Sequence, residues 1–221
     1  MRLFLNIRIV EHFSNEWFEN NLQKTLVCVT IHSLDHKNKI MNNDTPNRET
    51  ILQSDEVILR VLTSSDVPDI ARLMNNKNIW DNVRDYIPHP YTEQDGQAFV
   101  DATQTENPPL TFAITHQEAL CGVIGLVRLV NEQRHVAELG YWLGEPYWGK
   151  NIMTKALKLT TDYAFQQLGI IRLQTIVFEY NTGSMRVLEK CGYTREAVCK
   201  KAIIKNENIW DAHTFALVQS D

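Results

Sequence analysis

The sequence predicts an α/β domain in which a twisted, mixed sheet is flanked by helices. At residues 135–154 an apolar and aromatic strand stops at Gly144 and Pro146, and a helix-period pattern opens at Ile152. A second apolar strand follows that helix at 170–178, and a strand–helix–strand crossover makes the two strands parallel neighbours. Short polar turns join other strands directly, which predicts antiparallel pairs in the same sheet.

Length and composition fit one folded domain that carries an extension. The chain has 221 residues, 43% of them apolar, which is enough for the core of one domain with about 50 residues left over. Residues 1–55 show no clean period and become polar towards their end, so we assign them to an N-terminal extension and polar linker, whose degree of order is left open. A translation start at Met41 and a partner-binding role are both open for them. The folded domain is assigned to 56–221.

Charge and apolar runs restrict the class of partner. The net charge of −5 argues against a partner bound through its nucleic-acid backbone. No run reaches the ~18 apolar residues of a membrane span, and Asn6 and Arg8 interrupt the segment that a signal peptide would need. We expect a cytoplasmic protein, monomer or homodimer, without nucleic-acid or membrane partners.

The cysteines and histidines indicate neither a disulfide framework nor a metal site. The cysteines lack paired spacing and fit free, buried thiols in a reducing compartment; they are Cys28, Cys121, Cys191 and Cys199. His32 and His36 have helical i,i+4 spacing, but no Glu follows the first and no third ligand is evident. We expect no metal.

The first half of the domain combines capped helices with strands. Thr63 or Ser64 before Asp66, and Thr92 before Asp95, are typical of helix starts. In order, the expected elements are a strand at 57–62, a helix to about Met74, a helix from Thr92 to about Thr103, and strands at 110–115 and 121–129.

The second half begins with the central strand at 135–143. Its helix runs from Ile152 to Leu168 with one apolar stripe, and Gly169 is a good stop. The remaining elements are a strand at 170–178, a short helix that Asn181 caps and Gly192 closes, and a hairpin of strands at 193–201 and 209–218.

The turn before the long helix is suited to an anion. Residues 147–151 are polar and lie at the mouth of the helix, where unpaired N–H groups and the positive end of the dipole favour an anion such as a pyrophosphate. Gly149-Lys150 is not a nucleoside-triphosphate loop, because the pattern Gly-x-x-x-x-Gly-Lys-Ser/Thr is missing.

Two motifs carry a family resemblance. Glu138–Leu143 with Tyr147–Thr154 resembles the acetyl-CoA site of the GNAT superfamily, in the branch similar to ribosomal-protein N-terminal acetyltransferases. That family's loop reads Arg/Gln-x-x-Gly-x-Gly/Ala and falls here on Trp148, Asn151 and Met153. Asn151 tolerates the positive φ of the first glycine. Met153 replaces a small residue that leaves room for the pyrophosphate, so crowding by its side chain is open, and we expect cofactor binding to survive.

The second motif follows about thirty residues later. The family's Asn-x-x-Ser and Glu-Lys-x-Gly-Phe/Tyr patterns fall on residues of the short helix and the turn after it: Asn181, Ser184, Glu189, Lys190, Gly192 and Tyr193. The resemblance covers about 56–219. It implies a GNAT-type N-acyltransferase fold, in which the two parallel strands splay apart and the pantetheine of acetyl-CoA lies between them.

The resemblance also implies which residues bind acetyl-CoA, the expected acetyl donor. They are Trp142, Leu143, Trp148, Gly149, Lys150, Asn151, Ile152, Met153, Thr154 and Asn181. It implies acetyl transfer to a primary amine, most directly a protein or peptide N-terminus. A small-molecule amine is the alternative, and a non-catalytic acyl-CoA-binding module is a rival from another class.

For catalysis the candidates are Glu138 and Ser184. Glu138 shares a strand face with Val136, Gly140 and Trp142, and an apolar setting there would raise its pKa towards that of a useful general base. Alternatively, an arginine pairs with it and holds the strand. The resemblance points to Ser184 or a water as the acid for the CoA thiolate, but Ser184 can equally be a first-turn residue that satisfies backbone donors.

The segment from Asn75 to Tyr91 shapes the acceptor pocket in the resembled family. Trp80, Arg84, Tyr86 and Tyr91 are therefore candidates to line it. The alternative is a loop whose aromatic side chains only cover the core.

Overall fold

The computed structural model describes residues 50–220, with side chains from Leu52 onward. The extension before residue 50, with His32, His36 and Cys28, lies outside the described residues. Within them, no helix is long and apolar enough to cross a membrane.

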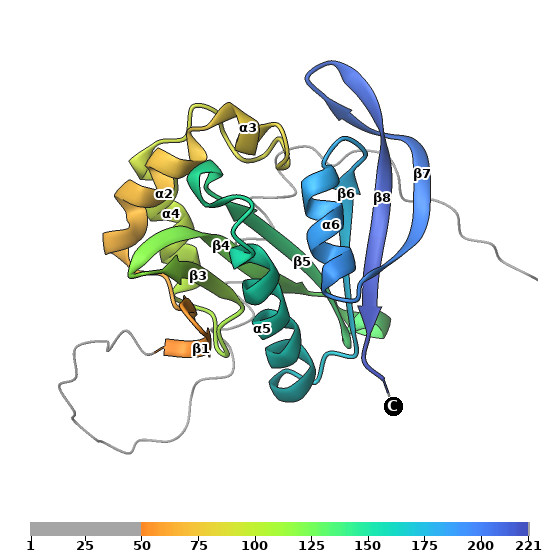
Figure 1. The fold of residues 1–221 in the computed structure, drawn as a ribbon, viewed down its shortest axis with the longest axis horizontal. Helices are drawn as coiled ribbons and strands as arrows, with labels where there is room; N and C mark the ends of the chain where they lie inside the picture. The colour runs from red at the N-terminus through yellow and green to blue at the C-terminus, as the bar shows by residue number, and fades with distance from the viewer. Residues whose placement is uncertain (1–49, 221) are drawn as a thin grey trace, which may run out of the picture. The chain divides into compact units, whose positions relative to one another are not determined.

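One eight-stranded mixed sheet organises the described residues, in the order β1-β2-β3-β4-β5-β6-β8-β7 (Figure 1). Its strands are β1 (Thr50–Ser54), β2 (Val57–Arg60), β3 (Thr111–His116), β4 (Ala119–Arg128), β5 (Val136–Leu143), β6 (Arg172–Phe178), β7 (Thr194–Lys205) and β8 (Asn208–Val218). The helices are α2 (Val67–Met74), α3 (Lys77–Trp80), α4 (Glu93–Thr103), α5 (Ile152–Gln167) and α6 (Thr182–Lys190). The expected mixed sheet flanked by helices is confirmed.

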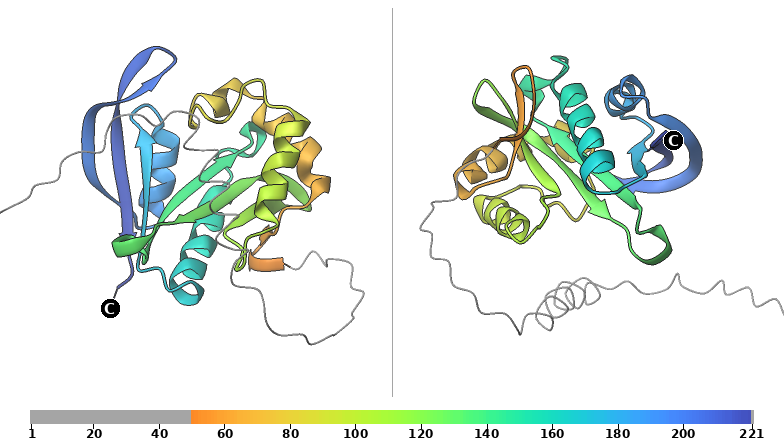
Figure 2. Two further views of the ribbon diagram at one scale, coloured as in Figure 1. Left: turned by 180° about the vertical axis from the view of Figure 1, so that it is seen from behind. Right: turned by 90° about the horizontal axis from the view of Figure 1, so that it is seen from below.

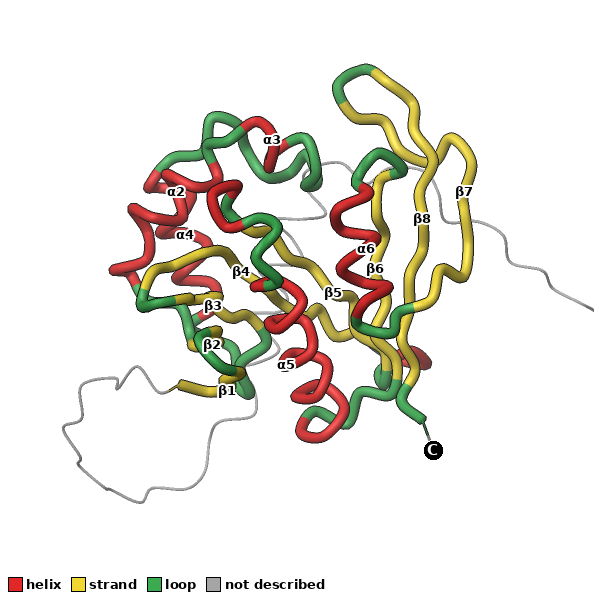
Figure 3. The backbone as a smooth tube through the Cα atoms, in the orientation of Figure 1, coloured by secondary structure: helices red, strands yellow, loops and turns green. Residues whose placement is uncertain are grey.

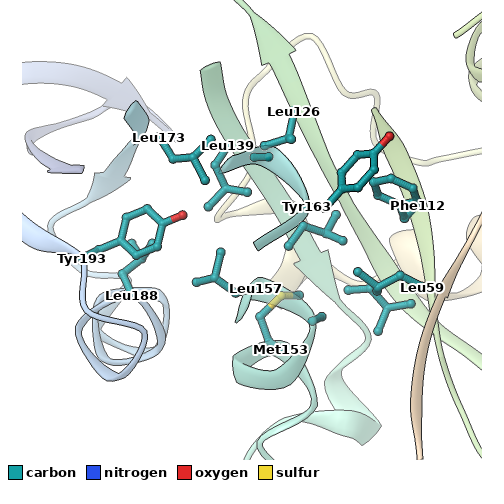
Figure 4. Close-up of a cluster of buried hydrophobic side chains, with 14 of the residues drawn as sticks. Leu59, Phe112, Leu126, Leu139, Met153, Leu157, Tyr163, Leu173, Leu188 and Tyr193 are labelled. Carbon is teal, nitrogen blue, oxygen red and sulfur yellow. The ribbon is translucent and has the colours of Figure 1, made fainter. Parts of the chain in front are cut away.

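The helices cover the two faces of the sheet in two separate cores (Figure 2). The larger core lies under α5 and α6, and Figure 4 shows it around Leu157 and Tyr163. The smaller core lies under α2 and α4 and includes Val67 and Val100. Both faces of the central strands are therefore buried, as their apolar runs require.

Two boundaries differ from those expected by more than two residues. The sheet begins at Thr50, inside the segment we had assigned to the linker, because residues 50–54 pair with β2 in an antiparallel hairpin. At the other end, β7 continues to Lys205 instead of stopping at 201, since a bulge between Cys199 and Ile203 restores its pairing with β8. Neither pairing is visible in the local hydrophobic period.

The three described cysteines are free. Cys121 is buried as expected and Cys191 is half-buried, but Cys199 is exposed on the edge strand β7. The expectation of buried thiols was therefore wrong for Cys199.

Among the strands that the structure describes, β5 and β6 are the one parallel pair, and they pair briefly. The pairs run from Val136–Arg172 to Glu138–Gln174, after which β6 pairs only with β8. Figure 3 shows the two strands diverging beyond this point, with α5 and α6 in front of them. The expected splay is present.

Candidate active site

In the second half of β5, where the strand no longer pairs with β6, some backbone N–H and carbonyl groups still face the side of β6. The Leu129 N–H donates to the Val136 carbonyl at 3.0 Å, and the Gly144 N–H donates to the Cys121 carbonyl at 2.7 Å. Even-numbered residues of β5 therefore direct their backbone to β4, whereas Tyr141 and Leu143 direct theirs the other way. These two N–H groups, and not that of Trp142, face the side on which β6 diverges from β5.

Residues 147–151, which we call the anion loop after the ligand that the sequence predicts for it, lead into the start of α5. Asn151 caps the helix in the left-handed region at φ 58°, as expected for the residue in the glycine position, and Gly149 has φ 75°. The first helical bond runs from the Lys155 N–H to the Asn151 carbonyl at 3.1 Å. The N–H groups of residues 152–154 precede that bond, so they point out of the helix at its positive end.

Met153 does not crowd this loop. Its side chain is 6% exposed and packs in the larger core beside Leu157 (Figure 4). The side chain therefore leaves the loop free, because the second residue of the helix points its side chain to the sheet. Of Met153, only the backbone is left at the start of the helix.

Trp148 fastens the loop to the end of β5. Its indole Nε1–H donates to the Leu143 carbonyl at 2.7 Å, although 45% of the residue is exposed. The neighbouring Lys150 holds its ammonium 5.7 Å from the centre of the Tyr147 ring. The Trp148 bond thus connects the anion loop directly to the end of β5.

Glu138 lies on the face of β5 opposite α5 and α6. Its side chain is 42% exposed and its Oε2 lies 3.8 Å from Nη2 of Arg84, which is 59% exposed. The expected apolar setting was therefore wrong, and the alternative of an arginine partner is observed. Exposed pairs of this kind contribute about 0–1 kcal/mol, so this one does little to hold the strand. Next on the same face, Gly140 borders open space, since a Cβ there would meet nothing within 4 Å.

Ser184 forms a hydroxyl pair that the sequence did not reveal. The Asn181 side chain caps α6 by accepting from the Ser184 N–H at 3.0 Å, as predicted. The Ser184 Oγ lies 2.7 Å from the Tyr141 hydroxyl, so it reaches from α6 to β5 and not to its own backbone. Burial raises the pKa of Tyr141, which keeps its hydroxyl protonated. The strand alternation, which puts Tyr141 on the face of Leu139, was the available signal.

The four acceptor-segment candidates divide into two groups. Tyr91 is 8% exposed and packs in the smaller core, so it covers the core and does not line a pocket. Trp80 is half-buried, stacks on His89 and donates from Nε1 to the Ile87 carbonyl at 3.0 Å. Arg84 faces Glu138, and Tyr86 is 72% exposed. The aromatic-cover alternative holds for Tyr91 and in part for Trp80.

The comparisons with known proteins agree with this architecture. The family model "Acetyltransferase (GNAT) domain" matches residues 56–194. A probable N-acetyltransferase of Bacillus subtilis, YjcK, is 38% identical over 96 residues, which make up 43% of this chain. The chain spans about half of that relative, since the match covers 52% of its length.

Two solved structures share the fold. The RimL ribosomal L7/L12 alpha-N-protein acetyltransferase, in complex with coenzyme A, has a TM-score of 0.69 at 22% identity and covers 77% of this chain and 98% of its own. The spermidine N-acetyltransferase of Vibrio cholerae, with CoA and spermine, has a TM-score of 0.65 at 21% identity and covers 75% and 97%. With the family match over more than half of its length, the chain belongs to the GNAT acetyltransferase family and is an acetyl-CoA-dependent N-acetyltransferase.

Proposed function

We propose that this enzyme acetylates the N-terminal amine of a protein or peptide, with Glu138 as the base. The observation that carries the proposal is the exposed Glu138 carboxylate beside the open space over Gly140, where β5 leaves β6. A peptide end can approach such an open face, whereas a small metabolite usually needs a pocket that encloses it.

Acetyl-CoA would lie in the splay and end at the helix start. Its pyrophosphate would meet residues 149–154, and its pantetheine would run past the Asn181 cap between the strands. The Tyr141 and Leu143 N–H groups, which face this side, are the donors for the thioester oxygen. They would stabilise the oxyanion as the amine attacks. Trp142, whose side chain packs partly against the smaller core, would border the thioester on the acceptor face.

Proton transfer uses Glu138 on one face of β5 and the Ser184–Tyr141 hydroxyl pair on the other face. Glu138, directly or through a water, takes the proton that the attacking nitrogen loses. As the tetrahedral intermediate collapses, the C–S bond breaks and the sulfur leaves as thiolate. Ser184 donates a proton to that sulfur as the protonated Tyr141 hydroxyl donates to Ser184. A proton from solvent then restores Tyr141, and Glu138 returns to solvent the proton that it took from the amine. Acetylated amine and free CoA are the products.

A weak base is sufficient for an α-amine. An N-terminal amine with a pKa near 8 is about ten per cent neutral at pH 7, whereas a lysine amine near 10.4 is well below one per cent. The exposed Glu138, which lies outside any apolar pocket, suits an N-terminal amine better than a lysine amine. A small amine is the second candidate, because the structurally similar Vibrio cholerae enzyme is a spermidine acetyltransferase.

A panel of acceptors tests the substrate class. We expect thiol release from acetyl-CoA with free N-terminal peptides, none with the same peptides already N-acetylated, and little with spermidine or free amino acids. Peptide turnover should rise with pH up to about 8, as the α-amine becomes neutral. Turnover of spermidine alone would assign the site to small amines.

The anion loop can be tested at Asn151. Replacing Asn151 by valine forces a β-branched residue to φ 58°, a strain of roughly 1–3 kcal/mol, so we expect the acetyl-CoA Kd to rise about tenfold or more. Asn151→Gly is the matched control and should bind as tightly as the parent or more tightly. Equal calorimetric Kd values for the two variants would show that the loop does not hold the cofactor.

A further inference from the structure

Lys205, at the end of β7, is a lysine that the proposed chemistry does not use. Its side chain is 1% exposed, although the residue lies at the tip of the β7–β8 hairpin. A buried ammonium is costly unless every donor finds a partner. Its partners therefore show what the residue holds in place.

Among the described residues, the partners of its side chain lie in α3 and in the acceptor loop, which we define as residues 81–91. The Lys205 Nζ donates to the Asp85 carboxylate at 2.6 Å and to the Val83 carbonyl at 3.0 Å. It also lies 3.7 Å from the centre of the Trp80 ring, which is within cation–π range. Lys205 thus binds the two chain neighbours of Arg84, one on each side.

Further contacts join the same parts of the chain. The Asn206 side chain donates to the Asp81 carboxylate at 2.8 Å, and the Tyr180 hydroxyl donates to the Asp81 carbonyl. Hairpin tip and acceptor loop lie near each other in Figure 1. These contacts connect the acceptor loop to the C-terminal half of the sheet. That half lies across the splay from α2 and α4.

We propose that Lys205 is a positioning residue that locks the acceptor loop, and with it Arg84, against Glu138. The inference rests on the proposed acceptor site. Arg84 is 59% exposed and lies 3.8 Å from its partner, so that ion pair alone cannot fix the loop. The buried contacts of Lys205 hold the acceptor loop in one conformation, which the exposed ion pair cannot do. Without them the loop would open locally, and Arg84 and Glu138 would face the acceptor together only part of the time.

The test replaces Lys205 by methionine, which keeps the length of the side chain and removes the ammonium. We expect amide hydrogen exchange in residues 81–91 to speed up at least about tenfold, and the KM for the acceptor to rise about tenfold. The acetyl-CoA Kd and the exchange in α5 should not change. Lys200→Met on the same strand is the matched control, because the Lys200 side chain is 77% exposed in its ion pair with Asp211.

Asp85→Asn is a second variant in case the methionine protein does not fold. It keeps the Val83 and Trp80 contacts and weakens the lock by removing one charge, so a smaller rise in loop exchange is expected. Unchanged exchange in 81–91 in both variants would overturn the proposal. The exchange measurement needs no acceptor: faster loop exchange would support the lock even if no peptide were acetylated, an outcome that would reject only the proposed substrate.

Discussion

Replacing Glu138 by glutamine is expected to lower kcat about 100-fold at neutral pH, which is within the usual contribution of a general base. Glutamine keeps the shape of the side chain but cannot accept the proton that the attacking amine must lose. Since the pair with Arg84 is exposed and 3.8 Å long, the variant should keep the melting temperature of the parent. Steady-state kinetics with a free N-terminal peptide would measure the loss, and calorimetry should give an unchanged acetyl-CoA Kd.

Glu196→Gln is the control for a general effect of removing a carboxylate. Glu196 is 40% exposed, close to the 42% of Glu138, and it also pairs with an arginine, Arg172. Its loss should leave kcat unchanged. If Glu138 acts mainly by deprotonating the ammonium form of the acceptor, its defect should shrink as the pH passes the amine pKa of about 8. Turnover by the Glu138 variant that matches the parent would remove the base assignment.

Local signals predicted most of the fold. Thr63 and Thr92 form capping boxes with acidic residues three positions later, and Asn181 accepts from the third N–H of its helix. Gly169 and Gly192 stop helices with φ values of 64° and 86°. Each signal depends on a few neighbouring residues, so it can be recognised in the sequence before any tertiary contact is known.

The missed features depend on partners far away in the chain. The direction of the Met153 side chain is set by the core that α5 meets, and the length of β7 by a bulge against β8. The setting of Glu138 depends on Arg84, more than fifty residues earlier. Lys205 reads as a polar hairpin residue in the sequence, yet it is buried because it reaches the acceptor loop. Hydrophobic period alone cannot encode such contacts.

Gly122→Ala should damage both stability and cofactor binding. A Cβ at Gly122 would lie 2.3 Å from the Trp142 carbonyl oxygen and 2.9 Å from the Leu143 Cα, and both are backbone atoms that cannot rotate away. Overpacking of this kind costs roughly 1–3 kcal/mol or more, which lowers the melting temperature of a domain of this size by about 5–10 °C. Because Leu143 accepts from Trp148, the displaced strand end should also move the anion loop and raise the acetyl-CoA Kd.

Gly140→Ala is the matched control for that prediction, since it makes the same change on the adjoining strand. Its Cβ would enter open space, and alanine restricts the unfolded chain more than glycine does. Its melting temperature should therefore equal or exceed that of the parent, with the same acetyl-CoA Kd. Gly122→Ala could instead have the melting temperature and the acetyl-CoA Kd of the control. The close approach of β4 to the end of β5 would then not position the anion loop, and the assignment of the Tyr141 and Leu143 N–H groups as donors would lose its structural basis.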